Sequence, residues 1–98
     1  MRLSPHEIAA IKAAAAHAFG PDAVVRLFGS RVDDARRGGD IDLHIEAGEL
    51  ADEWAARQRF EDNLFARIEE QRVDVAVRCR SDAPFGIDLI AMRDGVVL

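Results

Sequence analysis

Hydrophobic residues recur along the chain with two different periods, and each period predicts a different kind of element. A spacing of three to four residues is typical of a helix that buries one face, whereas polar–apolar alternation is typical of a half-buried strand. The helical spacing predicts helices over residues 5–19, 49–71 and 85–93. Alternation and one short apolar run predict strands over residues 23–28, 40–46 and 72–78. Helices and strands therefore share the chain, and the expected fold class is α+β.

Both ends of the first predicted helix are marked by residues that favour a helix boundary. Ser4 is suited to the N-cap, Pro5 to the first turn, and Glu7 completes a capping box with Ser4. Gly20-Pro21 ends the helix, because proline cannot continue it. The start of this element is therefore expected at Pro5 and its end just before Gly20.

In the second predicted helix, five large side chains fall on one face when turned at 100° per residue. They are expected to form its buried stripe and are Leu50, Trp54, Leu64, Phe65 and Ile68. The polar residues Arg57, Gln58 and Glu61 interrupt this stripe, so either a break in the helix or an exposed middle is expected.

Length and composition limit the function classes. The 98 residues are expected to form one domain, residues 1–98. The formal net charge of −5 argues against a broad face for nucleic acid. No segment is suited to a signal peptide or a membrane span, and Cys79 is the only cysteine. A cytoplasmic protein without a membrane partner or a disulfide is expected.

Two aspartates at the start of the second strand are the first candidate for chemistry. Asp40 and Asp42 point to the same face of a strand, because side chains alternate. Two unit charges about 4 Å apart repel by roughly 4 kcal/mol at an effective dielectric near 20. A divalent cation relieves such repulsion, and Mg²⁺ is usually held by one or two carboxylates together with substrate phosphates. The alternative is a solvated strand end where the repulsion is tolerated.

A third acid, Asp74, stands in the middle of a valine-rich strand and requires a partner there. One position for it is beside Asp40 and Asp42 on a neighbouring strand. The alternative is a salt bridge to Arg72 or Arg78. His44 shares the polar face of the second strand, where a hydrogen-bonded histidine is expected.

The turn after the first strand offers groups that suit a phosphate. Gly29 allows close approach of the backbone to a ligand. Ser30, at the start of a short helical turn expected over residues 30–35, offers N–H groups and a hydroxyl. A plain turn is the alternative.

Taken together, Phe28-Gly29-Ser30-Arg31, the pair Asp40-Ile41-Asp42-Leu43 and a lone Asp74 in a valine strand resemble the polymerase-β-like nucleotidyltransferases. The match is to their minimal, stand-alone branch and covers nearly the whole chain. The resemblance implies that fold, with a small mixed three-stranded sheet and helices packed on one face. The loop of residues 31–39 is one residue shorter than is usual in the family, and Gly39 stands where the family often has serine.

The resemblance also implies the role of each residue. Gly29 and Ser30 would bind the triphosphate of ATP, and Arg31 is assigned to the same contact, with a surface arginine as the alternative. Asp40 and Asp42 would hold two Mg²⁺ ions, and Asp74 would hold only the ion next to the attacking hydroxyl. Two such ions can clamp the entering and leaving oxygens of an in-line displacement.

The function that the resemblance implies is transfer of AMP from ATP to a protein. Single-domain members of this size often act as antitoxins, which bind a HEPN-domain ribonuclease toxin and adenylylate one of its tyrosines. Two alternatives stay open. One is a small-molecule transferase of the aminoglycoside type, which usually carries an added helical domain; the other is a partner-binding module of the same fold with weak catalysis.

Overall fold

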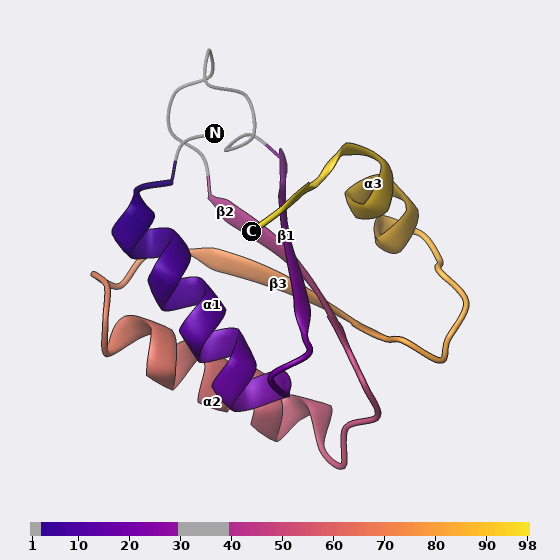
Figure 1. Ribbon diagram of the computed structural model, residues 1–98, viewed down its shortest axis with the longest axis horizontal. Coiled ribbons are helices and arrows are strands. Elements are labelled where there is room, and N and C mark those ends of the chain that lie inside the picture. The colour runs from indigo at the N-terminus through magenta and orange to yellow at the C-terminus, as the bar shows by residue number, and fades with distance from the viewer. Residues whose placement is uncertain (1–2, 30–39) are drawn as a thin grey trace.

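A computed structural model describes residues 3–29 and 40–98, which form an α+β fold with three helices and a four-stranded mixed sheet (Figure 1). The helices are α1 (Pro5–Phe19), α2 (Glu53–Phe65) and α3 (Ile87–Asp94). The strands are β1 (Val24–Phe28), β2 (Ile41–Ala47), β3 (Val73–Cys79) and β4 (Val96–Val97). The predicted class and the order of the first six elements are confirmed. The predicted turn over residues 30–35 lies outside the described residues.

The sheet has the strand order β3-β2-β1-β4. β2 pairs antiparallel with β1 and parallel with β3, and β4 pairs antiparallel with β1. The expectation of three strands was wrong by one, because Val96–Val97 adds to the edge of β1. A two-residue strand is too short to show alternation in a sequence.

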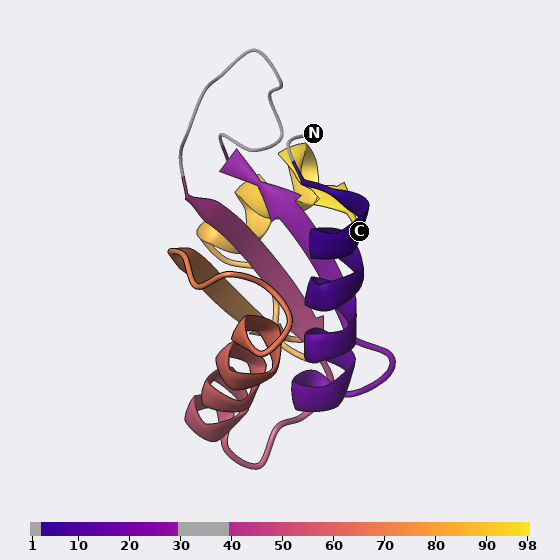
Figure 2. The same cartoon turned by 90° about the vertical axis from the view of Figure 1, so that its left-hand side faces the viewer.

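The helices do not all pack on one face of the sheet. α1 and α2 cover one face together, whereas α3 lies on the other (Figures 1 and 2). The prediction of one covered face was therefore wrong for α3. The polar side of β2 explains the difference, because Nε2 of His44 lies 2.7 Å from Oδ1 of Asp88 on α3.

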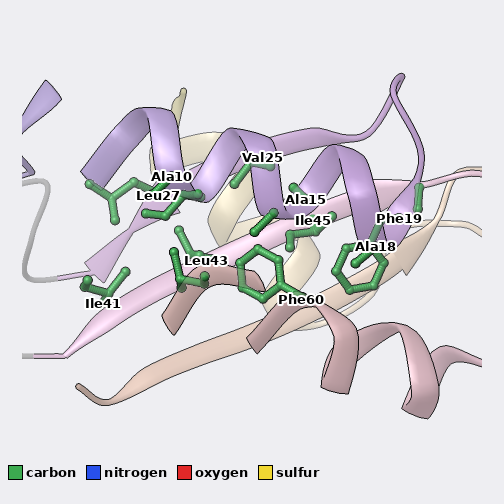
Figure 3. Packing of buried hydrophobic residues seen from close by; sticks show 14 of the residues in the cluster. Ala10, Ala15, Ala18, Phe19, Val25, Leu27, Ile41, Leu43, Ile45 and Phe60 are labelled. Atoms are coloured by element: carbon green, nitrogen blue, oxygen red, sulfur yellow. The ribbon is translucent and has the colours of Figure 1, made fainter. Parts of the chain in front are cut away.

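The core lies between the sheet and the layer of α1 and α2 (Figure 3). The apolar side of β2 contributes four fully buried residues, Ile41, Leu43, Ile45 and Ala47. The rings of Phe19 and Phe60 pack with centroids 5.9 Å apart and join the two helices. Because alternate residues of β2 face this core, Asp42 and His44 face the other side.

The first helix forms as its sequence predicts. Ser4 accepts a hydrogen bond from the backbone N–H of Glu7, and the Glu7 side chain accepts one from the N–H of Ser4. At the other end the N–H of Gly20 donates to the carbonyl of Ala16. Both predicted ends of the helix are confirmed.

The second helix is shorter than predicted and turned differently. It begins after Asp52, whose side chain accepts a hydrogen bond from the N–H of Ala55. It ends at Phe65 instead of residue 71. Its fully buried residues are Ala56, Phe60 and Leu64, spaced four apart. The predicted stripe was wrong at Trp54, whose side chain is 80% exposed.

Within the described residues, no helix is both long enough and apolar enough to cross a membrane.

Candidate functional site

Two of the three predicted acids stand side by side on the sheet. Asp42 of β2 is the direct partner of Asp74 of β3 in the parallel register. Both residues alternate with side chains that pack towards the core, so they share the face away from α1 and α2. Asp40 immediately precedes β2. The prediction that Asp74 lies beside Asp42 on a neighbouring strand is confirmed.

The carboxylates act on one another electrostatically. Burial raises the pKa of Asp42 above its ordinary value of 3.8, and the negative charges of Asp74 and Asp40 raise it further. Arg72 opposes this shift with its positive charge. Burial is the larger cause, and the repulsion between carboxylates adds to it, since both disfavour the charged form. The arrangement therefore stores repulsion that a cation can relieve.

Among the described residues, Arg72 forms ion pairs with two of the acids. Its Nε lies 3.3 Å from Oδ2 of Asp40 and 3.5 Å from Oδ1 of Asp74. The salt-bridge alternative for Asp74 is thus realised with Arg72. Arg78 instead pairs with Glu46. The side chain of Arg72 is 72% exposed, and such pairs contribute about 0–1 kcal/mol.

Gly29 brings the backbone at the end of β1 against this acid pair. Its φ is +78°, a conformation that side chains disfavour. A β-carbon built on Gly29 would lie 2.5 Å from Oδ2 of Asp42. Phe28, the residue before it, is paired with Asp42 in the antiparallel register. Ser30 and Arg31, the other predicted phosphate ligands, lie outside the described residues.

The three carboxylates suit a hard cation, but they are not arranged around a common point. Carboxylate oxygens are the ligands that Mg²⁺ prefers. In residues 3–29 and 40–98, no three acids, histidines or cysteines are close enough together to hold an ion as they stand. The guanidinium of Arg72 contacts both Asp40 and Asp74. The chemistry of the acids fits a divalent ion, and such an ion would share these carboxylates with Arg72.

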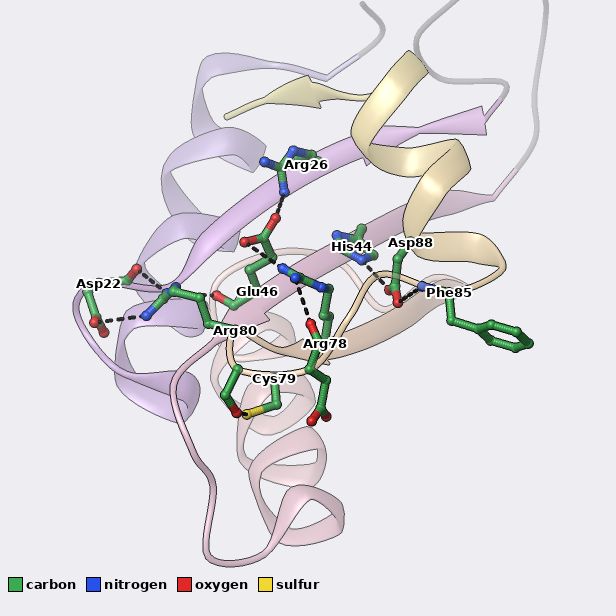
Figure 4. Close-up of polar contacts among 11 residues, drawn as sticks. Asp22, Arg26, His44, Glu46, Arg78, Cys79, Arg80, Phe85 and Asp88 are labelled. Atoms are coloured by element: carbon green, nitrogen blue, oxygen red, sulfur yellow. Dashed lines mark hydrogen bonds and ion pairs between the residues drawn. The ribbon is translucent and has the colours of Figure 1, made fainter.

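A second polar cluster continues along the same face of the sheet (Figure 4). Glu46 of β2 forms ion pairs with Arg26 of β1 and Arg78 of β3. His44 is fully buried beside it; Nε2 meets Asp88, and Nδ1 has no hydrogen-bond partner among the described residues. The expected hydrogen-bonded histidine is therefore confirmed for one ring nitrogen only.

Asp88 joins α3 to this face. Burial raises its pKa, but the hydrogen bonds from His44 and from the N–H of Phe85 outweigh burial and lower it below 3.8. The alternation of polar residues in β2 predicted that His44 faces away from the core. Nothing local in the sequence indicated Asp88 as its partner.

The structure also has two exposed features beside the predicted acids and glycine. A groove of about 350 Å³ runs between α2 and the outer edge of β3, and it includes Asp74. It is lined by Trp54, Arg57, Gln58, Glu61, Val73, Asp74 and Val75. The second feature, called here the C-terminal apolar surface, consists of Phe85, Ile87, Leu89, Ile90, Met92, Val96 and Val97, all exposed.

Comparison with known proteins yields no protein-family model that matches the chain and no significant match among curated proteins.

Proposed function

We propose that this chain is a Mg²⁺-dependent nucleotidyltransferase of the polymerase-β-like fold that transfers AMP from ATP to a hydroxyl group of a partner protein. The observation that carries the proposal is the junction of three strands, where a glycine with positive φ lies against Asp42 and Asp42 lies beside Asp74. This junction combines close backbone approach, which suits a phosphate, with paired carboxylates, which suit a hard cation.

Asp40, Asp42 and Asp74 are the residues that would hold Mg²⁺. When bound, Mg²⁺ neutralises phosphate charge and polarises the reacting groups. The raised pKa of Asp42 supports this assignment, because its carboxylate is partly buried and close to two other negative charges. Arg72 supports it too, since a cation already contacts the carboxylates of Asp40 and Asp74.

In the proposed reaction the chain positions the substrates and supplies no covalent nucleophile. Gly29, with Ser30 and Arg31, binds the triphosphate, and Asp74 lies next to the attacking hydroxyl. A bond forms between the hydroxyl oxygen and the α-phosphorus of ATP. The bond from that phosphorus to pyrophosphate breaks, pyrophosphate leaves, and the hydroxyl proton passes to solvent.

The acceptor we propose is a tyrosine of a HEPN-domain ribonuclease toxin, and the chain acts as its antitoxin in the cytoplasm. This assignment extends the resemblance of the motifs. The chain contains no tyrosine, so adenylylated tyrosine must belong to a second molecule. A bound and oriented complex is required to place the phenol in line with the leaving pyrophosphate.

A partner-binding module with weak catalysis is the second candidate. The C-terminal apolar surface favours it, because seven of the eight large apolar side chains exposed in the described residues lie there. Exposed apolar patches of this kind mark protein–protein contacts. This surface also serves an antitoxin that holds its toxin, so binding alone does not separate the two candidates.

The test is transfer to a co-purified partner. The chain is co-expressed with the protein encoded beside it, and ATP labelled at the α-phosphate is added with Mg²⁺. The radioactive label is expected on the partner alone. Intact mass measurement is expected to show the addition of one AMP to the partner. A partner that is bound and inhibited but unmodified supports the binding module. Transfer to an aminoglycoside, without a bound partner, supports the small-molecule transferase.

Variants of the acids separate their roles in the same assay. Asp74→Ala is expected to bind Mg·ATP nearly as the wild type does but to lose transfer, because it removes a group beside the hydroxyl. Asp40→Ala is expected to lose both. Equal loss of ATP binding in the two variants contradicts this division.

A further inference from the structure

β3 forms one edge of the sheet, and part of its backbone faces outward. The N–H of Ile41 on the β2 side donates to the carbonyl of Arg72 at 3.3 Å. Because these directions alternate along a strand, the backbone groups of Val73, Val75 and Val77 face away from β2. The carbonyl of Val75 confirms this direction, since it accepts a hydrogen bond of 2.5 Å from Nη1 of Arg57. In the described part of the chain no strand lies beyond this edge.

Trp54 forms one wall of the groove along this edge. Its side chain is 80% exposed, and the core is complete without it, because Phe60 and Leu64 supply the buried face of α2. Exposed tryptophan is enriched at the energetic centres of protein contacts. Arg57 and Gln58 add polar side chains to the same wall. Arg57 donates to Glu53 and to the carbonyl of Val75, and Gln58 donates to Asp62, so an incoming peptide exchanges its own groups for these bonds.

The position of the groove relative to the acids indicates from which side an acceptor hydroxyl would approach. Crossing the sheet from β1 to β3, the order is Gly29, Asp42, Asp74 and then the groove. In an in-line displacement the nucleophile and the leaving group lie on opposite sides of the phosphorus. If the triphosphate lies at Gly29, the hydroxyl must approach from the side of Asp74, where the groove opens.

We propose that the groove between α2 and the outer edge of β3 is the acceptor site, that it binds an extended segment of the acceptor protein along β3, and that Trp54 packs against the acceptor's tyrosine. The proposal rests on the proposed function and adds the surface and the residues that select the acceptor. Addition of a peptide strand to an exposed sheet edge is a common mode of recognition, with main-chain hydrogen bonds supplying affinity.

The geometry also bears on which hydroxyl the groove can deliver. Val73 and Val75 point to the α2 side of the sheet, whereas the carboxylate of Asp74 points to the other. A hydroxyl delivered from the groove must therefore pass over the edge of β3. We therefore expect a long side chain such as tyrosine to be accepted in preference to serine or threonine.

The chain itself provides the probe for a test. Trp54 is its single tryptophan and it has no tyrosine, so protein emission excited at 295 nm comes from the groove. Acrylamide quenching of this emission is measured with α,β-methylene-ATP and Mg²⁺, and then after addition of a blocked glycine pentapeptide with a central tyrosine. Nucleotide alone is expected to leave the quenching constant unchanged, and the peptide is expected to at least halve it.

Transfer of AMP to the same peptide is the second readout. Trp54→Ala is expected to raise the KM for the peptide about tenfold or more, with the Kd for Mg·ATP unchanged. Arg59→Ala is the matched control, since Arg59 is exposed on the same helix but does not line the groove. The serine form of the peptide is expected to accept no AMP.

Each other outcome decides between explanations. Protection of Trp54 by nucleotide alone overturns the proposal, because the groove then holds the base of ATP. A peptide that accepts AMP without protecting Trp54 from quenching also overturns it. So does a peptide that neither protects Trp54 nor accepts AMP in a chain that binds nucleotide. Protection by peptide in a chain that binds no nucleotide removes the proposed function and leaves a peptide-binding groove. Failure of both ligands to bind overturns both proposals.

Discussion

A β-carbon on Gly29 would stand 2.5 Å from Oδ2 of Asp42, closer than two non-bonded atoms approach. The end of β1 and the carboxylate of Asp42 on β2 can therefore lie this close only because residue 29 has no side chain. Gly29 also has a φ of +78°. Glycine is therefore favoured here for two reasons, the backbone conformation and the position of the Asp42 carboxylate.

This contact predicts the effect of Gly29→Ala. The positive φ costs an alanine roughly 1–2 kcal/mol, and the new methyl group must displace the carboxylate of Asp42. We expect a loss of stability of that size in urea unfolding and loss of the rise in Tm that Mg·ATP gives. A ligand that binds only the folded state adds about 2.7 kcal/mol at a hundredfold excess over Kd.

Gly86→Ala is the matched control. Gly86 also has a positive φ, +56°, but a β-carbon there has no atom within 4 Å. It should lose a similar amount of stability and keep the response to Mg·ATP. If Gly29→Ala also keeps the rise in Tm with Mg·ATP, binding of Mg·ATP does not depend on the present position of the Asp42 carboxylate.

The raised pKa of Asp42 predicts how stability changes with pH. The folded chain binds this proton more tightly than the unfolded chain, so stability falls as pH rises from about 3.8 through the raised folded pKa. Asp42→Asn removes this penalty. We expect the metal-free variant to melt a few degrees or less above the wild type at neutral pH, with the gain lost below pH 3.8.

Asp94→Asn is the control for this effect, because the hydrogen bond from Arg93 lowers the pKa of Asp94. This variant should show no gain at neutral pH. An Asp42→Asn gain that is equal at every pH would place its cause outside the ionisation of Asp42.

The contacts of Arg72 predict competition with a divalent ion. Removing its guanidinium by Arg72→Ala leaves Asp40 and Asp74 free to bind a cation. We expect half-saturation with Mn²⁺, followed by electron paramagnetic resonance, at a lower concentration than in the wild type. Stability without metal should change by less than about 1 kcal/mol, because both ion pairs are exposed.

Arg67→Ala serves as the control for Arg72→Ala, since Arg67 bonds within α2 and its following turn, to Asn63. It should leave Mn²⁺ binding unchanged. Weaker Mn²⁺ binding in Arg72→Ala would show that this arginine assembles the acids instead of competing for them.

The bond between His44 and Asp88 predicts where local opening occurs. α3 buries only Ala91 fully, so the hydrogen bond of 2.7 Å to His44 is a large part of its attachment to the sheet. Asp88→Asn weakens this bond, because it removes the charge that strengthens it. We expect faster amide hydrogen exchange over residues 87–94, with β2 and α1 unchanged.

Arg93→Gln, on the same helix but in an exposed pair with Asp94, is the control and should leave exchange over α3 as in the wild type. Faster exchange throughout the sheet in Asp88→Asn would mean that the bond supports the whole fold.

Local patterns in the sequence determined much of the fold and the position of the acids. The capping box at Ser4, the alternation in residues 40–46 and the lone Asp74 among valines each depend on neighbours within a few residues. Such patterns record which side chains face a core, and so they predicted the first six elements and the pairing of Asp42 with Asp74.

Contacts between distant segments were decided only by the tertiary structure. Residues 96–97 became a strand because β1 offered a free edge, and α3 lies on the second face because Asp88 meets His44. Phe60 took the core position expected for Trp54, since the cap at Asp52 and the packing against Phe19 set how α2 is turned. The sequence offered Arg72 as a partner of Asp74, two residues away. That Arg72 also meets Asp40 depends on β2 and β3 lying side by side, so no local pattern revealed it.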